Sequence, residues 1–143
     1  DRVTKAMVLD SDPNPELLQH TERVALGEAD AFVSHSWHDD ADAKWEALQE
    51  WRAEFQEVMG REPRVWFDKF CIDQTNIADS LVGLPVYLAG CDKLLILHGE
   101  TYERRLWCLL EMFTFIVMGG SVHNLVVRQL RTCQSDFAGF DAR

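Results

Sequence analysis

One carboxylate, Glu111, lies in a segment of the chain that is otherwise almost entirely apolar. Residues 102–118 repeat with the period of a helix, and a rotation of about 100° per residue predicts one broad apolar arc that should cover a sheet. The predicted arc comprises Leu106, Leu109, Leu110, Phe113, Ile116 and Val117. The opposite side would carry Arg104, Trp107, Cys108, Glu111, Phe115 and Met118. A helix that is apolar on nearly all sides is buried, faces a cleft or meets a partner.

Trp107 and Glu111 stand at positions i and i+4, so they should share one face of this helix. An indole ring beside a carboxyl group disfavours the charged form and raises its pKa unless a donor compensates. A carboxyl group beside a flat aromatic wall suits the stabilisation of a sugar cation, as in glycoside-cleaving enzymes. The alternative is an ion pair between Glu111 and Arg104 or another surface group, and the periodicity leaves both open.

Three polar segments follow apolar runs and are richer in polar and aromatic side chains than a connector requires. They are residues 34–40, 68–74 and 98–102. In a doubly wound sheet, ligands bind beyond the carboxyl ends of the strands. We therefore expect the three segments to converge at one edge of the sheet.

The first of these segments holds four side chains that a metal hydrolase could use, namely His35, His38, Asp39 and Asp40. Four such residues on one loop lack the fixed geometry and helical spacing of a zinc site. We therefore predict a solvated loop and no metal.

The elements that must position these residues alternate in type along the chain. Short apolar runs predict strands at 31–33, 64–67, 93–97 and 125–127. Amphipathic spacing predicts helices at 42–59, 76–89 and 102–118. This β-α-β-α-β-α-β order predicts an α/β fold with a parallel sheet and helices on both faces.

Several residues mark where the predicted helices begin and end. Gly60 is placed to cap the C-terminus of the first helix, and Gly119 with Gly120 to end the last one. Pro85 should break or kink the middle helix, so two short helices are as well supported as one. Thr101 is placed to cap the N-terminus of the last helix.

The domain that these elements build spans residues 30–131. Residues 1–29 form an N-terminal extension, in which Asn14 and Pro15 are placed to cap a short helix that reaches about Leu26. Asp12 and Pro13 indicate a turn, and an edge strand at residues 7–9 stays open. The polar residues 132–143 are predicted to be a tail or an incomplete last helix.

The composition fits one globular domain of 143 residues with a net charge of -10. Such a surface repels phosphate backbones, and the only basic pair is Arg104-Arg105, so we expect no nucleic-acid partner. The four cysteines form no CxxC pair and no zinc-site spacing. Cys91 and Cys108 lie in apolar stretches, which favours reduced thiols in a cytoplasmic protein. Neither a membrane-spanning run nor a signal peptide is present, so we expect no membrane contact from this segment.

Four motifs in order resemble the Toll/interleukin receptor (TIR) domain family. Asp30-Ala-Phe-Val-Ser-His35 resembles the first-strand signature, and Val65-Trp-Phe-Asp68 resembles the second strand with the start of the BB loop. Leu88-Ala-Gly-Cys-Asp-Lys-Leu-Leu-Ile-Leu97 is similar to the segment that leads into the following strand. Leu106-Trp-Cys-Leu-Leu-Glu111 is similar to the W-C-x-x-E motif of the next helix, the most specific of the four.

The resemblance implies a flavodoxin-like fold with a parallel sheet of about five strands. It also implies cleavage of the nicotinamide–ribose bond of NAD+, with NAD+ as substrate and no cofactor, in a signalling or defence context. The catalytic glutamate of the family matches Glu111. The substrate-binding residues would be His35, Ser36, Trp37, Asp68, Phe70 and, from the helical spacing, Trp107.

Other functions remain open beside NAD+ hydrolysis or cyclisation. Non-catalytic members of the family are adaptors that self-associate, and catalytic members often need assembly to complete the pocket. The chain departs from the family at Ser36-Trp37, where some catalytic members have arginines, and at residues 70–74 and Pro85. A phospho-receiver domain shares the fold but needs an acceptor Asp after its third strand, whereas Asp68 follows the second predicted strand.

Overall fold

Four parallel strands form one sheet in the computed structural model, which describes residues 3–9, 14–71 and 76–131. The strands are β1 (Ala29–His35), β2 (Val65–Phe67), β3 (Cys91–His98) and β4 (Leu125–Gln129). Their order is β2-β1-β3-β4, so β1 and β3 are central and β2 and β4 are the edges. The predicted α/β fold with a parallel sheet is confirmed. The described part holds four strands, where the resemblance implied about five.

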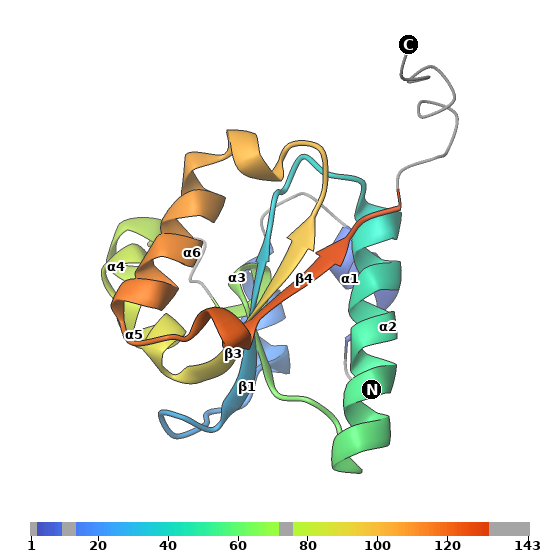
Figure 1. Cartoon of the computed structure of the whole chain (residues 1–143), viewed down its shortest axis with the longest axis horizontal. Helices are drawn as coiled ribbons and strands as arrows, with labels where there is room; N and C mark the ends of the chain where they lie inside the picture. The colour runs from blue at the N-terminus through green and yellow to red at the C-terminus, as the bar shows by residue number, and fades with distance from the viewer. Residues whose placement is uncertain (1–2, 10–13, 72–75, 132–143) are drawn as a thin grey trace.

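Helices cover both faces of this sheet (Figure 1). One face carries α1 (Lys5–Leu9) and α2 (Ala41–Met59), and the other carries α4 (Ile77–Val82), α5 (Leu84–Ala89) and α6 (Leu106–Val117). The short elements are α3 (Asp68–Cys71) and the 3-10 helices η1 (Pro15–His20), η2 (Tyr102–Arg104) and η3 (Val122–Asn124).

Strand β1 is buried along its whole length, because both faces of the sheet are covered. Its side chains alternate between two hydrophobic clusters. Ala31 and Val33 pack with Trp51 of α2, whereas Phe32 packs with residues of α5 and α6. The same alternation directs the polar residues at the end of the strand to opposite faces.

Two of the predicted local signals at the helix ends are confirmed, and one is wrong. Gly60 caps α2 in the left-handed conformation with φ 69°. Pro85 stands at the start of α5, and Gly83 separates that helix from α4. The predicted cap at Thr101 is wrong, because the chain first forms η2 and α6 begins after Arg105 without a side-chain cap.

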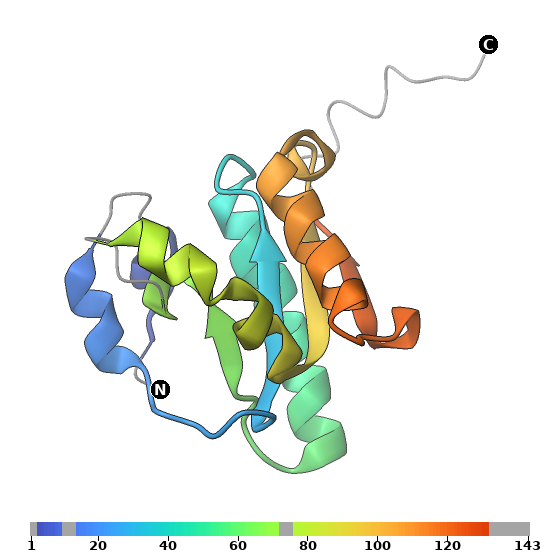
Figure 2. The same cartoon turned by 90° about the vertical axis from the view of Figure 1, so that its left-hand side faces the viewer.

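The N-terminal extension packs beside the edge strand β2 (Figure 2). Asn14 caps η1 by accepting a hydrogen bond of 3.0 Å from Glu16 N, as predicted, but the turn ends at His20 and does not reach Leu26. Leu17 is buried in the same cluster as Trp51. Residues 7–9 belong to α1, so the edge strand that the sequence left undecided there is not formed. The predicted turn at residues 12–13 and the tail 132–143 lie outside the described residues.

The predicted orientation of helix α6 is wrong. Its buried residues are Cys108, Glu111 and Phe115, which the periodicity placed away from the sheet. The six residues of the predicted arc are exposed by 37–81%. Both sides of this helix are apolar, so hydrophobicity alone does not choose between them. The side that holds Glu111 faces the sheet because a polar side chain at the end of β1 forms a hydrogen bond with the carboxyl group there.

No helix in the described part of the chain combines the length and the apolar character needed to cross a membrane.

Candidate functional site

Ser34, near the carboxyl end of β1, forms a hydrogen bond with the carboxyl group of Glu111. The Ser34 hydroxyl donates to Glu111 Oε2 over 2.5 Å, and it also lies 2.7 Å from the phenol oxygen of Tyr102. All three side chains are buried. The alternation of β1 puts Ser34 on the same face as Phe32, and helix α6 covers that face. The sequence prediction named Glu111 but missed Ser34 and Tyr102.

The buried position of Glu111 is electrostatically costly. Burial raises its pKa to about 8, and the negative charge of Asp68 adds to the rise. Hydrogen bonds from Ser34 and Trp107 act in the opposite direction but do not outweigh burial. The indole neighbour predicted from the spacing is therefore present. Both hydrogen-bond partners are neutral, and the ion pair with Arg104 that the sequence left open is not formed within the described residues.

His35 and Asp68 form a second buried group on the other face of β1. His35 Nε2 lies 3.0 Å from Asp68 Oδ1, and the His35 ring stacks on Phe67 with a centroid distance of 4.7 Å. Trp37 Nε1 donates to Asp68 Oδ2 over 2.8 Å, and the backbone N–H of Lys69 donates to Oδ1 over 2.7 Å. Burial by itself would raise the pKa of Asp68. The charge of His35 and the hydrogen bonds from His35 and Trp37 outweigh burial, so the pKa of Asp68 lies below its usual value.

Ser36 and Asp39 bind the loop that follows β3. The hydroxyl oxygens of Ser36 and Thr101 are 2.6 Å apart, and Asp39 Oδ1 accepts from the N–H and the hydroxyl of Thr101 over 2.9 and 2.8 Å. The Lys44 ammonium donates to the carbonyl of Ser36 over 2.9 Å, and burial lowers its pKa. A Cβ on Gly99 would lie 2.3 Å from the Asp39 carboxylate, so this contact requires glycine.

These contacts correct the prediction of a solvated loop at residues 35–40. His35 and Asp39 are buried, while Trp37, His38 and Asp40 are exposed. Asp40 is also the N-cap of α2 and accepts from Ala43 N over 2.7 Å. Within the described ranges, no three His, Cys, Asp or Glu side chains are arranged to hold a metal ion.

The predicted convergence of the three polar segments holds for the backbone of their described residues, 34–40, 68–71 and 98–102, whereas the side chains divide into separate groups. Residues 72–74 of the second segment lie outside the described residues. Ser34 and Glu111 lie on the α6 face, and His35 with Asp68 lies on the α2 face next to Phe67. A cavity of about 350 Å³ opens elsewhere, along the outer edge of β2. Of the predicted substrate-binding residues in the described part of the chain, it includes only Phe70. Glu111 itself is 2% exposed.

Asp68→Ala is expected to lower the free energy of unfolding by about 3 kcal/mol at pH 7, because it leaves the buried His35 imidazole and the indole N–H of Trp37 without their acceptor. Asp68→Asn should cost less, since the amide oxygen still accepts. The loss should shrink towards low pH, because a carboxyl with a lowered pKa stabilises the fold only while it is ionised. Urea unfolding at pH 7 and pH 3 measures both effects, and a loss independent of pH would contradict this role.

Comparison of the chain with protein-family models, with curated proteins and with solved structures finds no match.

Proposed function

We propose that this chain is a TIR-like domain that cleaves the nicotinamide–ribose bond of NAD+, with Glu111 as its catalytic residue. The observation that supports the proposal is a buried carboxyl group whose hydrogen-bond partners are neutral and whose pKa is raised to about 8. Such a group destabilises the fold at neutral pH, and costs of this kind cluster at functional sites. It also lies near the carboxyl ends of the central strands, where ligands of doubly wound sheets bind.

The chemistry requires a negative group beside the reacting ribose. When the glycosidic bond breaks, nicotinamide leaves with the bonding electron pair, and a ribosyl cation remains. Water then adds to the cation and releases a proton; an internal nucleophile in place of water gives the cyclic product. The positive nicotinamide ring of the substrate would favour the ionised form of Glu111 by lowering its pKa. The carboxylate would then stabilise the developing cation.

Access to Glu111 requires movement, because the carboxyl group is 2% exposed beneath neighbouring side chains. The segment 99–105 carries Tyr102 and joins β3 to α6, so its displacement would uncover the Ser34 hydroxyl and the carboxyl group together. Trp37 is 37% exposed and offers an aromatic face for a nucleotide base. The exposed Arg104 and Arg105 precede the uncapped start of α6 and would supply positive charge for the pyrophosphate.

The other residues that the sequence predicted for substrate binding would hold the side chains of the pocket in place. His35 and Asp68 hold the Trp37 indole through the Asp68 carboxylate. Ser36 ties the first loop to Thr101, and Trp107 contacts the carboxyl group of Glu111. Phe70 packs edge-on against Phe67 at a centroid distance of 5.7 Å.

The test is to incubate the purified chain with NAD+ and to measure nicotinamide release. Assays at high protein concentration and with a crowding agent provide conditions that favour assembly. We expect release of nicotinamide, together with ADP-ribose or its cyclic form. No release under any of these conditions would contradict the proposal, and full activity in Glu111→Ala would refute the assignment of Glu111.

A second candidate function is self-association in a signalling scaffold, which the exposed face of α6 favours. Leu106, Phe113 and Val117 are exposed by 81%, 66% and 63%. Apart from Glu111, which is buried, α6 contains no charged residue. A chain with a net charge of -10 repels its own copies, so an uncharged apolar face is the surface where two copies can approach at least cost.

Phe113→Glu is expected to weaken self-association at least tenfold, since it places a charge at the centre of this face. Sedimentation velocity over a range of protein concentrations measures the dissociation constant. Val58→Glu is the matched control, because Val58 is 81% exposed on α2, on the opposite side of the sheet. Equal association of both variants and the wild-type chain would contradict an interface on α6.

A further inference from the structure

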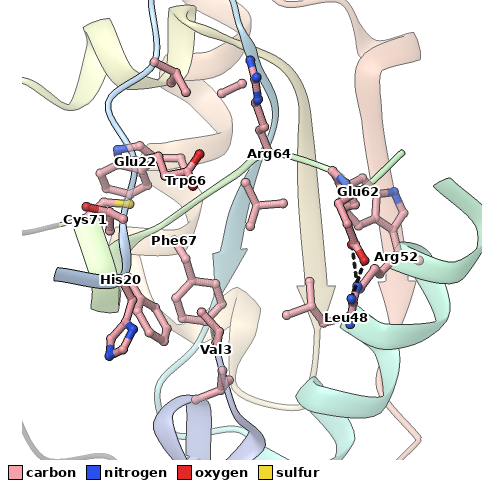
Figure 3. Close-up of a pocket in the computed structure, with 18 of the residues that line it drawn as sticks. Val3, His20, Glu22, Leu48, Arg52, Glu62, Arg64, Trp66, Phe67 and Cys71 are labelled. Carbon is pink, nitrogen blue, oxygen red and sulfur yellow. Dashed lines mark hydrogen bonds and ion pairs between the residues drawn. The ribbon is translucent and has the colours of Figure 1, made fainter. Parts of the chain in front are cut away.

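A cavity of about 350 Å³ lies between the outer edge of β2, helix α2 and the extended chain after η1. Figure 3 shows Trp66 and Phe67 of β2 beside this space, with Leu48 and Arg52 of α2 at one side and Glu22 at the other. Clefts of roughly 300–1,000 Å³ with apolar walls are the usual form of small-molecule sites. The cavity is distinct from the surroundings of Glu111.

The walls of the cavity are strongly aromatic. Three of the five tryptophans of the chain line it, and two phenylalanines complete the set, namely Trp45, Trp51, Trp66, Phe67 and Phe70. Trp66 already stacks on Phe32 and Tyr87, and Phe67 stacks on His35, so these rings offer an occupant their edges for edge-to-face contact. Five of the fifteen Trp, Phe and Tyr residues of the chain therefore line one space.

The charges at the rim neutralise one another. Arg52 Nε donates to Glu62 Oε2 over 2.7 Å, and this pair closes one side of the cavity (Figure 3). Arg64, a second arginine of the lining, lies 3.6 Å from Glu28. Each guanidinium thus has a carboxylate beside it, and the whole chain carries a net charge of -10. An anionic ligand would meet these carboxylates without a surplus positive charge.

We propose that this cavity binds an uncharged, flat aromatic molecule of two or three rings. The volume suits a molecule of that size, the indole and phenyl rings offer it edge-to-face contacts, and the paired rim charges give an anion no surplus positive charge. Phe67 also stacks on His35, so an occupant would contact the ring that supports the His35–Asp68 pair. The proposal does not rest on NAD+ cleavage.

Titration with N-phenyl-1-naphthylamine, an uncharged aromatic dye, tests the site directly. Excitation of tryptophan should produce dye emission by energy transfer, because three indoles line the cavity. We expect saturable binding of one dye per chain. Its sulfonated analogue, 8-anilinonaphthalene-1-sulfonate, has the same rings with a negative charge and should bind at least tenfold more weakly.

Two substitutions that fill the cavity from different elements locate the binding. Val24 and Val65 both line it, and they are 42% and 38% exposed, so a larger side chain does not disrupt the core. Val24→Phe and Val65→Phe should each weaken dye binding at least tenfold. Val122→Phe is the control, because Val122 is 65% exposed on η3 and lies outside the cavity lining.

Circular dichroism of each variant shows which ones keep the fold, and either filling variant alone suffices if the other unfolds. Unchanged dye binding in a folded filling variant would overturn the proposal. So would loss of binding in Phe113→Glu, which would place the dye on α6. Equal affinity for the sulfonated analogue would overturn the uncharged class of ligand.

Discussion

Glu111→Gln is expected to unfold less readily than the wild-type chain at pH 7, by about 3 kcal/mol. Burial raises the pKa of Glu111 from 4.5 to about 8, so the folded state holds a proton that the unfolded state has released between these pH values. The contribution of Glu111 to folding stability is therefore greatest below about pH 4.5 and falls as the pH rises towards 8. Glutamine has the same shape, carries no charge and still accepts the Ser34 hydroxyl, so its stability lacks this slope.

Urea unfolding of both chains at pH 4.5 and pH 7.5 measures the effect. The two free energies of unfolding should nearly coincide at the lower pH and separate at the higher one. Glu57→Gln serves as the control, because Glu57 is exposed on α2 and its substitution should change stability by less than about 0.5 kcal/mol. A stability difference of the same size at both pH values would show that the carboxyl group does not titrate as inferred.

The elements of the fold could be predicted from the sequence wherever the signal is local. Gly60 adopts the left-handed conformation that ends α2, and Pro85 stands at the start of α5, as their residue types require. Asn14 caps η1 for the same reason. Each of these signals involves neighbours within a few residues, so sequence distance and spatial distance agree.

The orientation of α6 could not be predicted, because two of its sides are apolar and helical periodicity ranks them by hydrophobicity alone. The more hydrophobic side, with Phe113 and Val117, is exposed. The buried side is fixed by a hydrogen bond between Ser34 and Glu111, residues 77 positions apart. Such a contact depends on the order of strands in the sheet, which the sequence pattern does not specify.

The candidate site was predictable only in part for the same reason. Alternation along β1 assigns Ser34 and His35 to opposite faces, and this division follows from strand geometry alone. The partners across each face do not follow from it, since Asp68 comes from the end of β2 and Thr101 from the segment after β3. Residue types therefore indicated which segments hold the candidate site, and the tertiary structure divides their side chains into separate groups.

Glu111→Gln is also expected to reduce nicotinamide release at least a hundredfold, as removal of one transition-state contact commonly does. The amide keeps the volume of the side chain and accepts from Ser34, but it cannot carry the charge that faces a ribosyl cation. The loss should appear in kcat more than in KM, because the charge matters most after the glycosidic bond begins to break. Since the same variant is expected to be more stable, reduced activity cannot arise from unfolding.

Ser34→Ala separates the charge of Glu111 from its position. The Ser34 hydroxyl favours the ionised carboxylate, so its removal should raise the pKa of Glu111 further above 8. If the ionised form is the reactive one, kcat/KM of the wild-type chain rises with pH through about 8, and the rise in Ser34→Ala is displaced to higher pH. Rates of nicotinamide release between pH 6 and pH 9.5 measure both profiles, with Glu57→Gln as the unchanged control. Identical profiles for Ser34→Ala and the wild-type chain would contradict ionisation of Glu111 as the controlling step.

Activity of Glu111→Gln within twofold of wild type would remove Glu111 from the chemistry and leave the exposed face of α6 as the functional surface.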